Sequence, residues 1–388
     1  MTGAVASPRR YQLRKQAVAI AASGHPWIFR DLMSSAADAF RDGDWLRLVD
    51  AANHTVGHGI YESQGAIAIR IVRTGPDRPD AAWFRGRLDA ALARRQALAD
   101  RTDAIRLVHG ESDGMPAVVI DRFADTLVAS SYSTGADSIA RYLTRLLVAS
   151  GRHGRHAILR PGKRRRGTPP ETRVLYGEPP PVVRFREDGV TYAVDRAAGQ
   201  KTGTYLDLRG LRRAIATAPL AGARVLNLFA YSGMLGRAAE LAGASSITQV
   251  DASDRALAFA AAHHVADPAR HTFIVADIFE WLPALVGEPF DLVIVDPPAM
   301  TSTTAQLPRA LAAYRSLYRA AARHVRPGGA VVAACCTSRI DRETFHRVVR
   351  ESLGTGFAHE RELAVELDHP VGFPQADYLK IAWWRRAR

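Results

Sequence analysis

The stretch Val225-Leu226-Asn227-Leu228-Phe229-Ala230-Tyr231-Ser232-Gly233 decides the fold that this sequence predicts. Its apolar first half is typical of a buried strand, and Ser232-Gly233 supplies a turn before a helical segment that begins near Met234. Further apolar strands are expected at residues 247–250, 272–275, 292–295 and 330–334, with helical segments between them. This alternation predicts a parallel, doubly wound α/β sheet from about residue 189 onward.

Three of these strands end at an aspartate, namely Asp251, Asp277 and Asp296. Asp251 lies 22 residues beyond Phe229, the spacing at which a carboxylate receives ribose hydroxyls in nucleotide-binding α/β folds. Asp277 is placed to accept a hydrogen bond from an adenine amino group. The alternative is that Asp251 and Asp277 only cap the helices that follow them. Three such acids on one sheet edge favour a ligand.

The turn after residue 229 also restricts the kind of ligand. It lacks the GxGxxG pattern that lets the backbone approach a pyrophosphate, so a dinucleotide fits poorly. S-adenosylmethionine contains adenosine without phosphates, and its positive sulfonium tolerates an acidic rim. We therefore expect S-adenosylmethionine as the cofactor.

The only two cysteines, Cys335 and Cys336, are neighbours at the end of the strand at residues 330–334. A thiol at the carboxyl end of such a strand suits a nucleophile, because ligands of open α/β sheets bind at that edge. The alternative is a pair of small buried hydrophobic residues. The spacing of Ser338 and Asp341 predicts a helix start close to the thiols, with Arg339 beside it, and both features favour a thiolate.

The composition indicates an intracellular protein with a polyanionic partner. The 388 residues exceed the usual size of one core, and 52 Lys and Arg against 39 Asp and Glu give a net charge of +13. No signal peptide or membrane span is expected, no HExxH or paired CxxC predicts a metal site, and the location is expected to be cytoplasmic. The run at residues 163–166 (KRRR) is either an RNA phosphate contact or a solvated loop.

The order of segments predicts three domains. Residues 1–75 read as short strands with turn signals, which indicate a small β-barrel. Residues 76–185 contain a helix from about Trp83 and a helix near Ser138, together with strands, and form a small central α+β domain. Residues 186–388 hold the parallel sheet, and a last strand at residues 378–384 is placed antiparallel at the sheet's end.

Several motifs resemble the ribosomal RNA large subunit 5-methylcytosine methyltransferases. They lie at residues 199–209 (GQKTGTYLDLR), 227–233 (NLFAYSG), 290–298 (FDLVIVDPP), 334–338 (ACCTS), 368–370 (DHP) and 373–380 (FPQADYLK). Residues 24–29 (GHPWIF) are similar to the PUA RNA-binding domain of this family, and residues 110–116 (GESDGMP) to the start of its central domain. The resemblance implies a class I, Rossmann-like methyltransferase domain at residues 186–388.

The resemblance also implies roles for individual residues. Cys336 takes the place of the family's nucleophile, and we expect Asp296 to hold the cytosine and to border the cofactor. The residues expected to bind S-adenosylmethionine are Gln200, Thr202, Asp207, Asn227, Phe229, Tyr231, Ser232, Gly233, Asp251, Asp277 and Asp296. The expected partner is ribosomal RNA, and dimers among relatives suggest a homodimer, although no interface follows from the sequence.

Two alternatives stay open. The Asp296-Pro297-Pro298 segment also suits an enzyme that methylates the amino group of an RNA purine, and a non-catalytic RNA-binding or assembly factor could keep the same fold. The base that removes the carbon 5 proton is not determined, with Asp368, His369 and Asp377 as candidates.

Overall fold

The computed structural model describes residues 8–34, 39–161, 172–196, 199, 201–301 and 303–388. The basic run at residues 163–166 and Gln200 lie outside these ranges. The chain divides into two compact units, Met1–Leu206 with Leu367–Phe373, and Asp207–Glu366 with Pro374–Arg388. Each unit is described by itself, and the predicted domain boundaries near residues 75 and 185 stay predictions.

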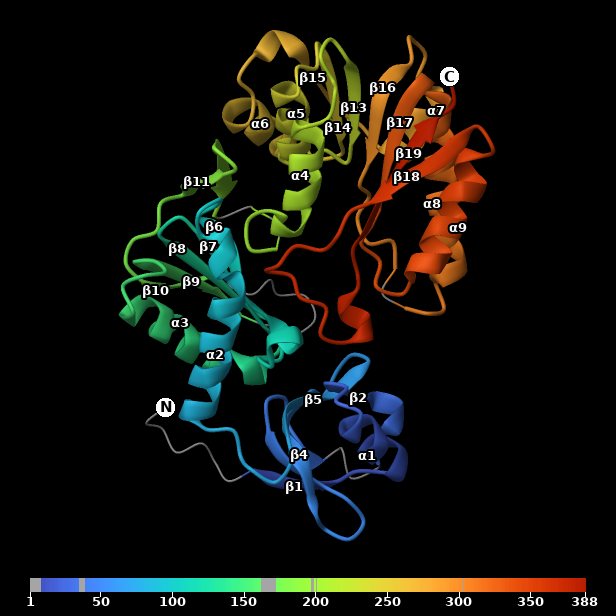
Figure 1. Cartoon of the computed structure of the whole chain (residues 1–388). Helices are drawn as coiled ribbons and strands as arrows, with labels where there is room; N and C mark the ends of the chain where they lie inside the picture. The colour runs from blue at the N-terminus through green and yellow to red at the C-terminus, as the bar shows by residue number, and fades with distance from the viewer. Residues whose placement is uncertain (1–7, 35–38, 162–171, 197–198, 200, 302) are drawn as a thin grey trace. The chain divides into compact units, whose positions relative to one another are not determined.

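The second unit is built on a seven-stranded sheet with the order β15-β14-β13-β16-β17-β19-β18 (Figure 1). Strands β13 to β17 are parallel, which confirms the predicted doubly wound α/β sheet. The bounds are β13 Arg224–Leu228, β14 Ser246–Asp251, β15 His271–Val275, β16 Phe290–Val295, β17 Val325–Cys335, β18 Phe357–Glu362 and β19 Lys380–Arg386.

The last strand, β19, is not at the sheet's end as the sequence suggested. It lies between β17 and β18 and is antiparallel to both. The edge position belongs to β18, whose side chains are mostly exposed and carry the polar sequence FAHERE. Such a strand has no apolar periodicity, and it suits an edge because charged side chains oppose further pairing.

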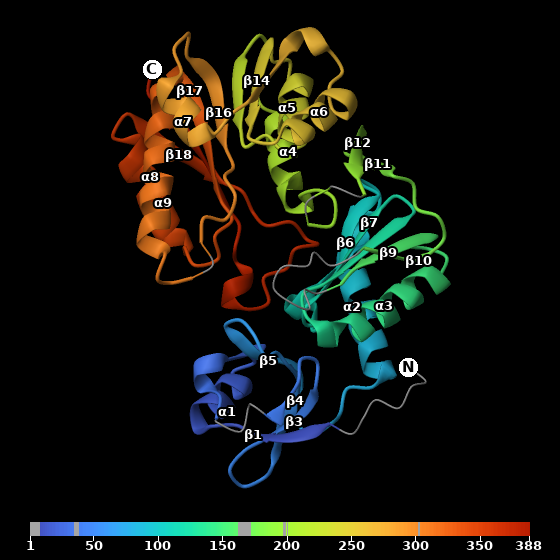
Figure 2. The same ribbon diagram turned by 180° about the vertical axis from the view of Figure 1, so that it is seen from behind.

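Helices connect the parallel strands and cover the sheet (Figure 2). Because such crossovers are right-handed, the reversal of strand order between β13 and β16 places α5 and α6 on one face and α8 and α9 on the other. This reversal creates the switch point at which ligands of doubly wound folds bind. The bounds are α4 Arg209–Ala216, α5 Met234–Leu241, α6 Asp254–His263, α7 Ile278–Ala284, α8 Leu307–Arg323 and α9 Arg342–Leu353.

The core of this unit follows the two-residue period of its strands. Leu226 and Leu228 of β13, and Val293 and Val295 of β16, belong to one buried cluster with Trp384 of β19. Each such aliphatic side chain contributes about 1.5–3 kcal/mol by leaving water. The apolar strands therefore hold their polar carboxyl ends in fixed register.

The first unit contains two further five-stranded sheets. The first, in the order β1-β3-β4-β5-β2, carries α1, and the second, in the order β10-β9-β8-β7-β6, carries α2 and α3. Strands of the first sheet are β1 Arg9–Gln12, β2 Trp27–Phe29, β3 Trp45–Val49, β4 Thr55–Tyr61 and β5 Ile67–Thr74, with α1 at Lys15–Ala22.

The second sheet and a separate hairpin complete this unit. The elements of the second sheet are α2 Ala81–Arg95, β6 Ala104–His109, β7 Val118–Phe123, β8 Thr126–Ser131, α3 Asp137–Ala149, β9 His156–Arg160 and β10 Arg173–Tyr176. The hairpin pairs β11 Val182–Glu187 with β12 Val190–Asp195. The three-part α/β architecture predicted from the sequence is thereby confirmed.

Candidate active site

The carboxyl ends of the five parallel strands bring together the predicted residues of the second unit. Strand order places them along one sheet edge in the sequence Asp277, Asp251, the loop at residues 229–233, Asp296 and Cys336. The loop and Asp296 follow β13 and β16, the pair at which the strand order reverses. The site therefore lies where a doubly wound sheet offers a crevice.

The loop at residues 229–233 is held in an unusual backbone conformation. Phe229, Tyr231 and Gly233 have φ values of +58°, +47° and +73°. A left-handed conformation costs a non-glycine residue about 1–2 kcal/mol, so Phe229 and Tyr231 keep it only because their surroundings require it. Strain of this kind is concentrated at binding loops.

Asp251 helps to hold Tyr231 in this left-handed conformation. Its two carboxylate oxygens accept backbone hydrogen bonds from Tyr231 N at 2.8 Å and Ser253 N at 2.9 Å. Ser253, not Asp251, caps α6, because its hydroxyl accepts from Ala256 N. The capping alternative therefore does not describe Asp251, which fastens the loop to the end of β14.

Packing beneath the loop also fixes its shape. Asn227 is fully buried and its amide nitrogen donates to Gln249 Oε1 at 3.2 Å. A Cβ atom at Gly233 would lie 2.7 Å from Ala260 Cβ, and one at Gly236 would lie 2.4 Å from Gln249 Oε1. Ser232 is also buried. Asn227 therefore contacts Gln249 beneath the loop. Only glycine fits at positions 233 and 236, where Ala260 and Gln249 approach the backbone.

Asp277 takes the capping role considered for it and keeps free acceptor capacity. It is exposed and caps α7, with one carboxylate oxygen accepting from Phe279 N at 2.9 Å. A carboxylate has about four acceptor positions, so Asp251 and Asp277 both keep capacity for further donors. Ribose hydroxyls and an adenine amino group are donors of that kind, and the residues on this side of the edge therefore fit an adenosine-containing ligand.

The two adjacent cysteines have different surroundings. Cys335 is 1% exposed and belongs to the main core cluster. Cys336 is half-buried, and its thiol donates to Pro297 O across 3.6 Å, at the end of the neighbouring strand β16. Cys335 therefore fits the core alternative, whereas Cys336 lies at the edge beside the Asp296-Pro297-Pro298 segment.

The turn after Cys336 is held by a lysine that the sequence analysis did not single out. Lys380 is fully buried and pairs with Cys335 across β17 and β19. Its ammonium group donates to Thr337 O at 3.0 Å, Ile340 O at 2.7 Å and Tyr378 O at 2.8 Å. Burial lowers the pKa of Lys380, and the nearby Cys335, Asp377 and Cys336 oppose that shift.

Thr337 joins this turn to the loop after β16. Its hydroxyl oxygen accepts from Met300 N at 3.2 Å and lies 2.9 Å from the hydroxyl of Tyr314 on α8. Burial raises the pKa of Tyr314, with a further contribution from Cys335, so the phenol stays neutral. The loop that carries Met300 is thereby tied to the turn that directly follows Cys336.

The predicted helix start near Cys336 is wrong in its position. The helix α9 begins at Arg342, and Asp341 is its cap, accepting from Thr344 N at 2.7 Å. Ser338 is exposed and lies outside the helix. Three residues of turn between Thr337 and Asp341 move the helix N-terminus away from the thiol, and the buried Lys380 is the cation that contacts this turn.

The remaining predicted residues lie in both units. In the second unit, Asp207 accepts from Tyr378 Oη at 2.6 Å, and Asp377 accepts from Arg342 at 2.6 and 2.8 Å. In the first unit, Thr202 is buried and donates to Asp121. Their roles in binding stay predictions.

The two other candidates for the proton-removing base form a buried pair in the first unit. Asp368 and His369 lie 2.9 Å apart, and Asp368 also accepts from Arg106 N at 3.0 Å. Among the residues that the structure describes, no group of three or more His, Cys, Asp or Glu side chains is arranged to hold a metal ion. Within the same ranges, no helix has the length and apolar character needed to cross a membrane.

Comparison with known proteins identifies both the domains and the cofactor. A family model described as S-adenosylmethionine-dependent methyltransferase matches residues 127–379, and one described as PUA-like domain matches residues 12–74. The structure resembles that of an S-adenosylmethionine-dependent methyltransferase from Streptococcus mutans, with a TM-score of 0.83, 21% identity, and coverage of 97% of this chain and 100% of the other. A methyltransferase structure complexed with SAH, SMU.776, gives a TM-score of 0.84 at 21% identity, covering 97% of this chain and 100% of the other.

Full-length relatives are similar over nearly the whole chain. The "Ribosomal RNA large subunit methyltransferase" of Deinococcus radiodurans is 33% identical over 98% of this chain and 98% of its own length. The "Ribosomal RNA large subunit methyltransferase I" of Alteromonas mediterranea is 33% identical over 92% of this chain and 93% of its own length. The expected cofactor, S-adenosylmethionine, is confirmed. With its PUA-like domain and its methyltransferase sheet, the chain belongs to the family of ribosomal RNA large subunit methyltransferases.

Proposed function

We propose that this enzyme methylates carbon 5 of a cytosine in large-subunit ribosomal RNA through a transient bond between Cys336 and carbon 6 of the base. The observation that carries the proposal is the half-buried thiol of Cys336, 3.6 Å from Pro297 O in the Asp296-Pro297-Pro298 segment. The names of the full-length relatives support ribosomal RNA as the substrate.

The chemistry explains why a thiol is useful at this position. Carbon 5 of cytosine is a poor nucleophile until a group adds to carbon 6. A thiolate adds readily, but an ordinary cysteine has a pKa of about 8.5, so nearby positive charge favours the reactive form. The ammonium group of Lys380, bound to Thr337 O directly after Cys336, is such a charge.

The proposed reaction has three steps, which are addition to carbon 6, methylation of carbon 5 and release of the enzyme. The sulfur–carbon 6 bond forms while Asp296, at the neighbouring strand end, gives a proton to N3 of the base. The bound cofactor supplies an electrophilic methyl group, which carbon 5 accepts. Removal of the carbon 5 proton by a base then restores the double bond and expels the Cys336 thiolate, while N3 returns its proton to the Asp296 carboxylate. A paired base is out of reach of a strand-end thiol, so the target is an unpaired or flipped-out cytosine.

An adduct experiment tests this proposal. The protein is incubated with S-adenosylmethionine and large-subunit RNA that contains 5-fluorocytosine, whose fluorine cannot be removed as a proton. We expect a denaturant-resistant protein–RNA adduct in the wild type and in Cys335→Ala, and none in Cys336→Ala. An adduct lost only in Cys335→Ala would move the nucleophile to the buried thiol.

The same experiment separates the alternatives. With S-adenosylmethionine that carries a labelled methyl group, transfer of this methyl group to a purine amino group would indicate amino-group methylation, provided that Cys336→Ala retains the transfer. RNA binding without any methyl transfer would indicate an RNA-binding or assembly factor. The predicted homodimer is tested independently by the molar mass of the protein in solution.

A further inference from the structure

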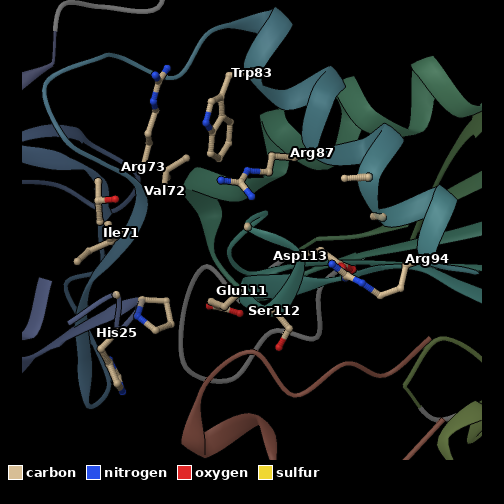
Figure 3. A pocket seen from close by; sticks show the side chains of 16 residues that line it. His25, Ile71, Val72, Arg73, Trp83, Arg87, Arg94, Glu111, Ser112 and Asp113 are labelled. Atoms are coloured by element: carbon tan, nitrogen blue, oxygen red, sulfur yellow. The ribbon is translucent and has the colours of Figure 1, made fainter. Parts of the chain in front are cut away.

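A cavity of about 460 Å³ lies within the first unit (Figure 3). It is bounded by residues 24–26 and 71–74 of the PUA-like domain, by α2, and by the short helical turn Gly110–Asp113 with Gly114. Figure 3 shows Trp83 and Arg87 entering it from α2, opposite Val72 and Arg73. Ligand cavities commonly measure about 300–1,000 Å³, so this one is large enough for a single nucleotide.

The two carboxylates of the cavity wall are already engaged by other arginines. Asp113 is bound by Arg94 and by the buried Arg95 at 2.6 Å, so two cations share one carboxylate. Glu111 is bound by Arg70 and accepts from Trp27 Nε1 at 2.9 Å. Neither acid is therefore left to neutralise a further cation in the cavity.

Arg87 is that further cation. In the part of the chain that the structure describes, no carboxylate lies within ion-pair distance of its guanidinium group, which instead lies 5.2 Å from the ring centre of Trp83. The two side chains share a helix face because they are four residues apart. Gly114, with φ +73°, leaves room for the stem of Arg87, since a Cβ atom there would lie 3.3 Å from Arg87 Cδ.

These features suit a nucleotide better than an isolated negative charge. A guanidinium fork binds a phosphate in two places, and an aromatic ring offers a stacking surface for a base. An acidic protein segment would use the charge but not the indole. Arg73, which pairs with the exposed Asp77 at 2.6 Å, adds a second cation to the wall.

We propose that this cavity binds one unpaired nucleotide of the RNA substrate, with its phosphate at Arg87 and its base against the surface formed by Trp83 and Arg87. The inference rests on the proposed function in so far as the substrate is RNA. It assigns a nucleotide-binding role to residues of the PUA-like domain and α2, none of which belongs to the set proposed to carry out methyl transfer.

Equilibrium binding of RNA by the full-length protein tests the inference without relying on catalysis. Binding of an unmodified large-subunit RNA transcript is measured for the wild type, Arg87→Gln, Trp83→Ala and the matched control Arg85→Gln. Arg85 is exposed on the same helix but does not line the cavity. We expect Kd to rise about tenfold in Arg87→Gln and Trp83→Ala, and less than twofold in Arg85→Gln. The slope of binding against salt should fall by about one in Arg87→Gln only.

Competition then identifies the occupant. A single-stranded oligonucleotide should displace the transcript more effectively from the wild type than from Arg87→Gln, whereas cytidine monophosphate and inorganic phosphate should compete only weakly. Equal Kd values for Arg87→Gln and Arg85→Gln would overturn the inference. So would displacement of the RNA by polyglutamate at the same charge concentration, which would indicate an acidic protein partner. If the wild type neither binds nor methylates RNA, the proposed function fails and not the cavity alone.

Discussion

On the β13–β15 side of the active-site edge, acidic side chains hold the backbone, whereas on the β16–β17 side a buried cation does so. Asp251 accepts from Tyr231 N and Ser253 N and remains partly accessible. Lys380 donates to three carbonyls around the turn after Cys336 and is fully buried. The first arrangement leaves carboxylate acceptors for a ligand. In the second, all three donors of the Lys380 ammonium group are used within the protein, so Lys380 acts on its neighbours through position and charge.

The difference teaches which measurements should respond to each side. Changes at the acidic side should alter cofactor affinity, and changes at the cationic side should alter the rate of transfer and the stability of the fold. A variant that lowered the cofactor affinity and the rate of transfer by the same factor would contradict the distinction.

The largest of these effects is expected for Asp251→Asn. The change removes the charge that we propose to bind the cofactor's hydroxyls and that holds Tyr231 N, so Kd for S-adenosylmethionine should rise about 10- to 100-fold. Transfer at saturating cofactor should change less than threefold. Calorimetric titration gives the affinity, with Asp254→Asn as a control that removes the same charge from the exposed first turn of α6. Equal affinities for the two variants would contradict the role of Asp251.

The next largest effect is expected for Lys380→Met. Its kcat should fall about tenfold, while its affinity for the cofactor should not change. Two buried carbonyls and one part-buried carbonyl lose their donor, so the free energy of unfolding should fall by about 2 kcal/mol in urea titration.

The control for Lys380→Met is Arg385→Met on the same strand. Arg385 pairs with Ala330 in the middle of β17, whereas Lys380 pairs with Cys335 at its end. Its loss should change stability but leave kcat within twofold. A fall in kcat for both variants alike would show that stability alone explains the Lys380 effect.

The smallest effect is expected for Asp341→Ala, which removes the cap of α9. It should cost about 1 kcal/mol of unfolding free energy at pH 7. The hydrogen bond from Thr344 N lowers the pKa of Asp341 below its ordinary value of 3.8. The stabilisation is therefore complete above that value and is lost as the pH falls through the lower folded pKa.

Urea titrations at pH 7 and in acid measure this change for Asp341→Ala. The control, Ser338→Ala, should match the wild type, because Ser338 lies outside the helix. A loss of stability in Ser338→Ala would restore the helix start predicted from the sequence.

The site residues that could be predicted from the sequence are those that directly follow an apolar strand in the chain. Apolar strands ending at Asp251, Asp296 or Cys336 repeat a pattern that the chain itself displays, and the sheet they predict is the one observed. Lys380 was missed because its burial depends on pairing between strands distant in sequence, β17 and β19. A lone charge at the start of the apolar strand at residues 380–384 was the available signal.

Other features depend on contacts that no local pattern contains. The spacing of Ser338 and Asp341 predicted a helix start at Ser338, but Asp341 itself is the residue that caps α9. Likewise, the sequence around Arg87 does not reveal that Glu111 and Asp113 pair with other arginines, because those partners come from distant segments and from the last turn of α2.

The position of β19 has a consequence for synthesis of the protein on the ribosome. This strand is inserted between β17 and β18, although both precede it in the chain. Neither β17 nor β18 can pair with β19 on the nascent chain before residues 380–386 have left the exit tunnel. Lys380 is part of this strand, so the turn after Cys336 gains the hydrogen bonds of the Lys380 ammonium group only after a segment more than 40 residues downstream has been made.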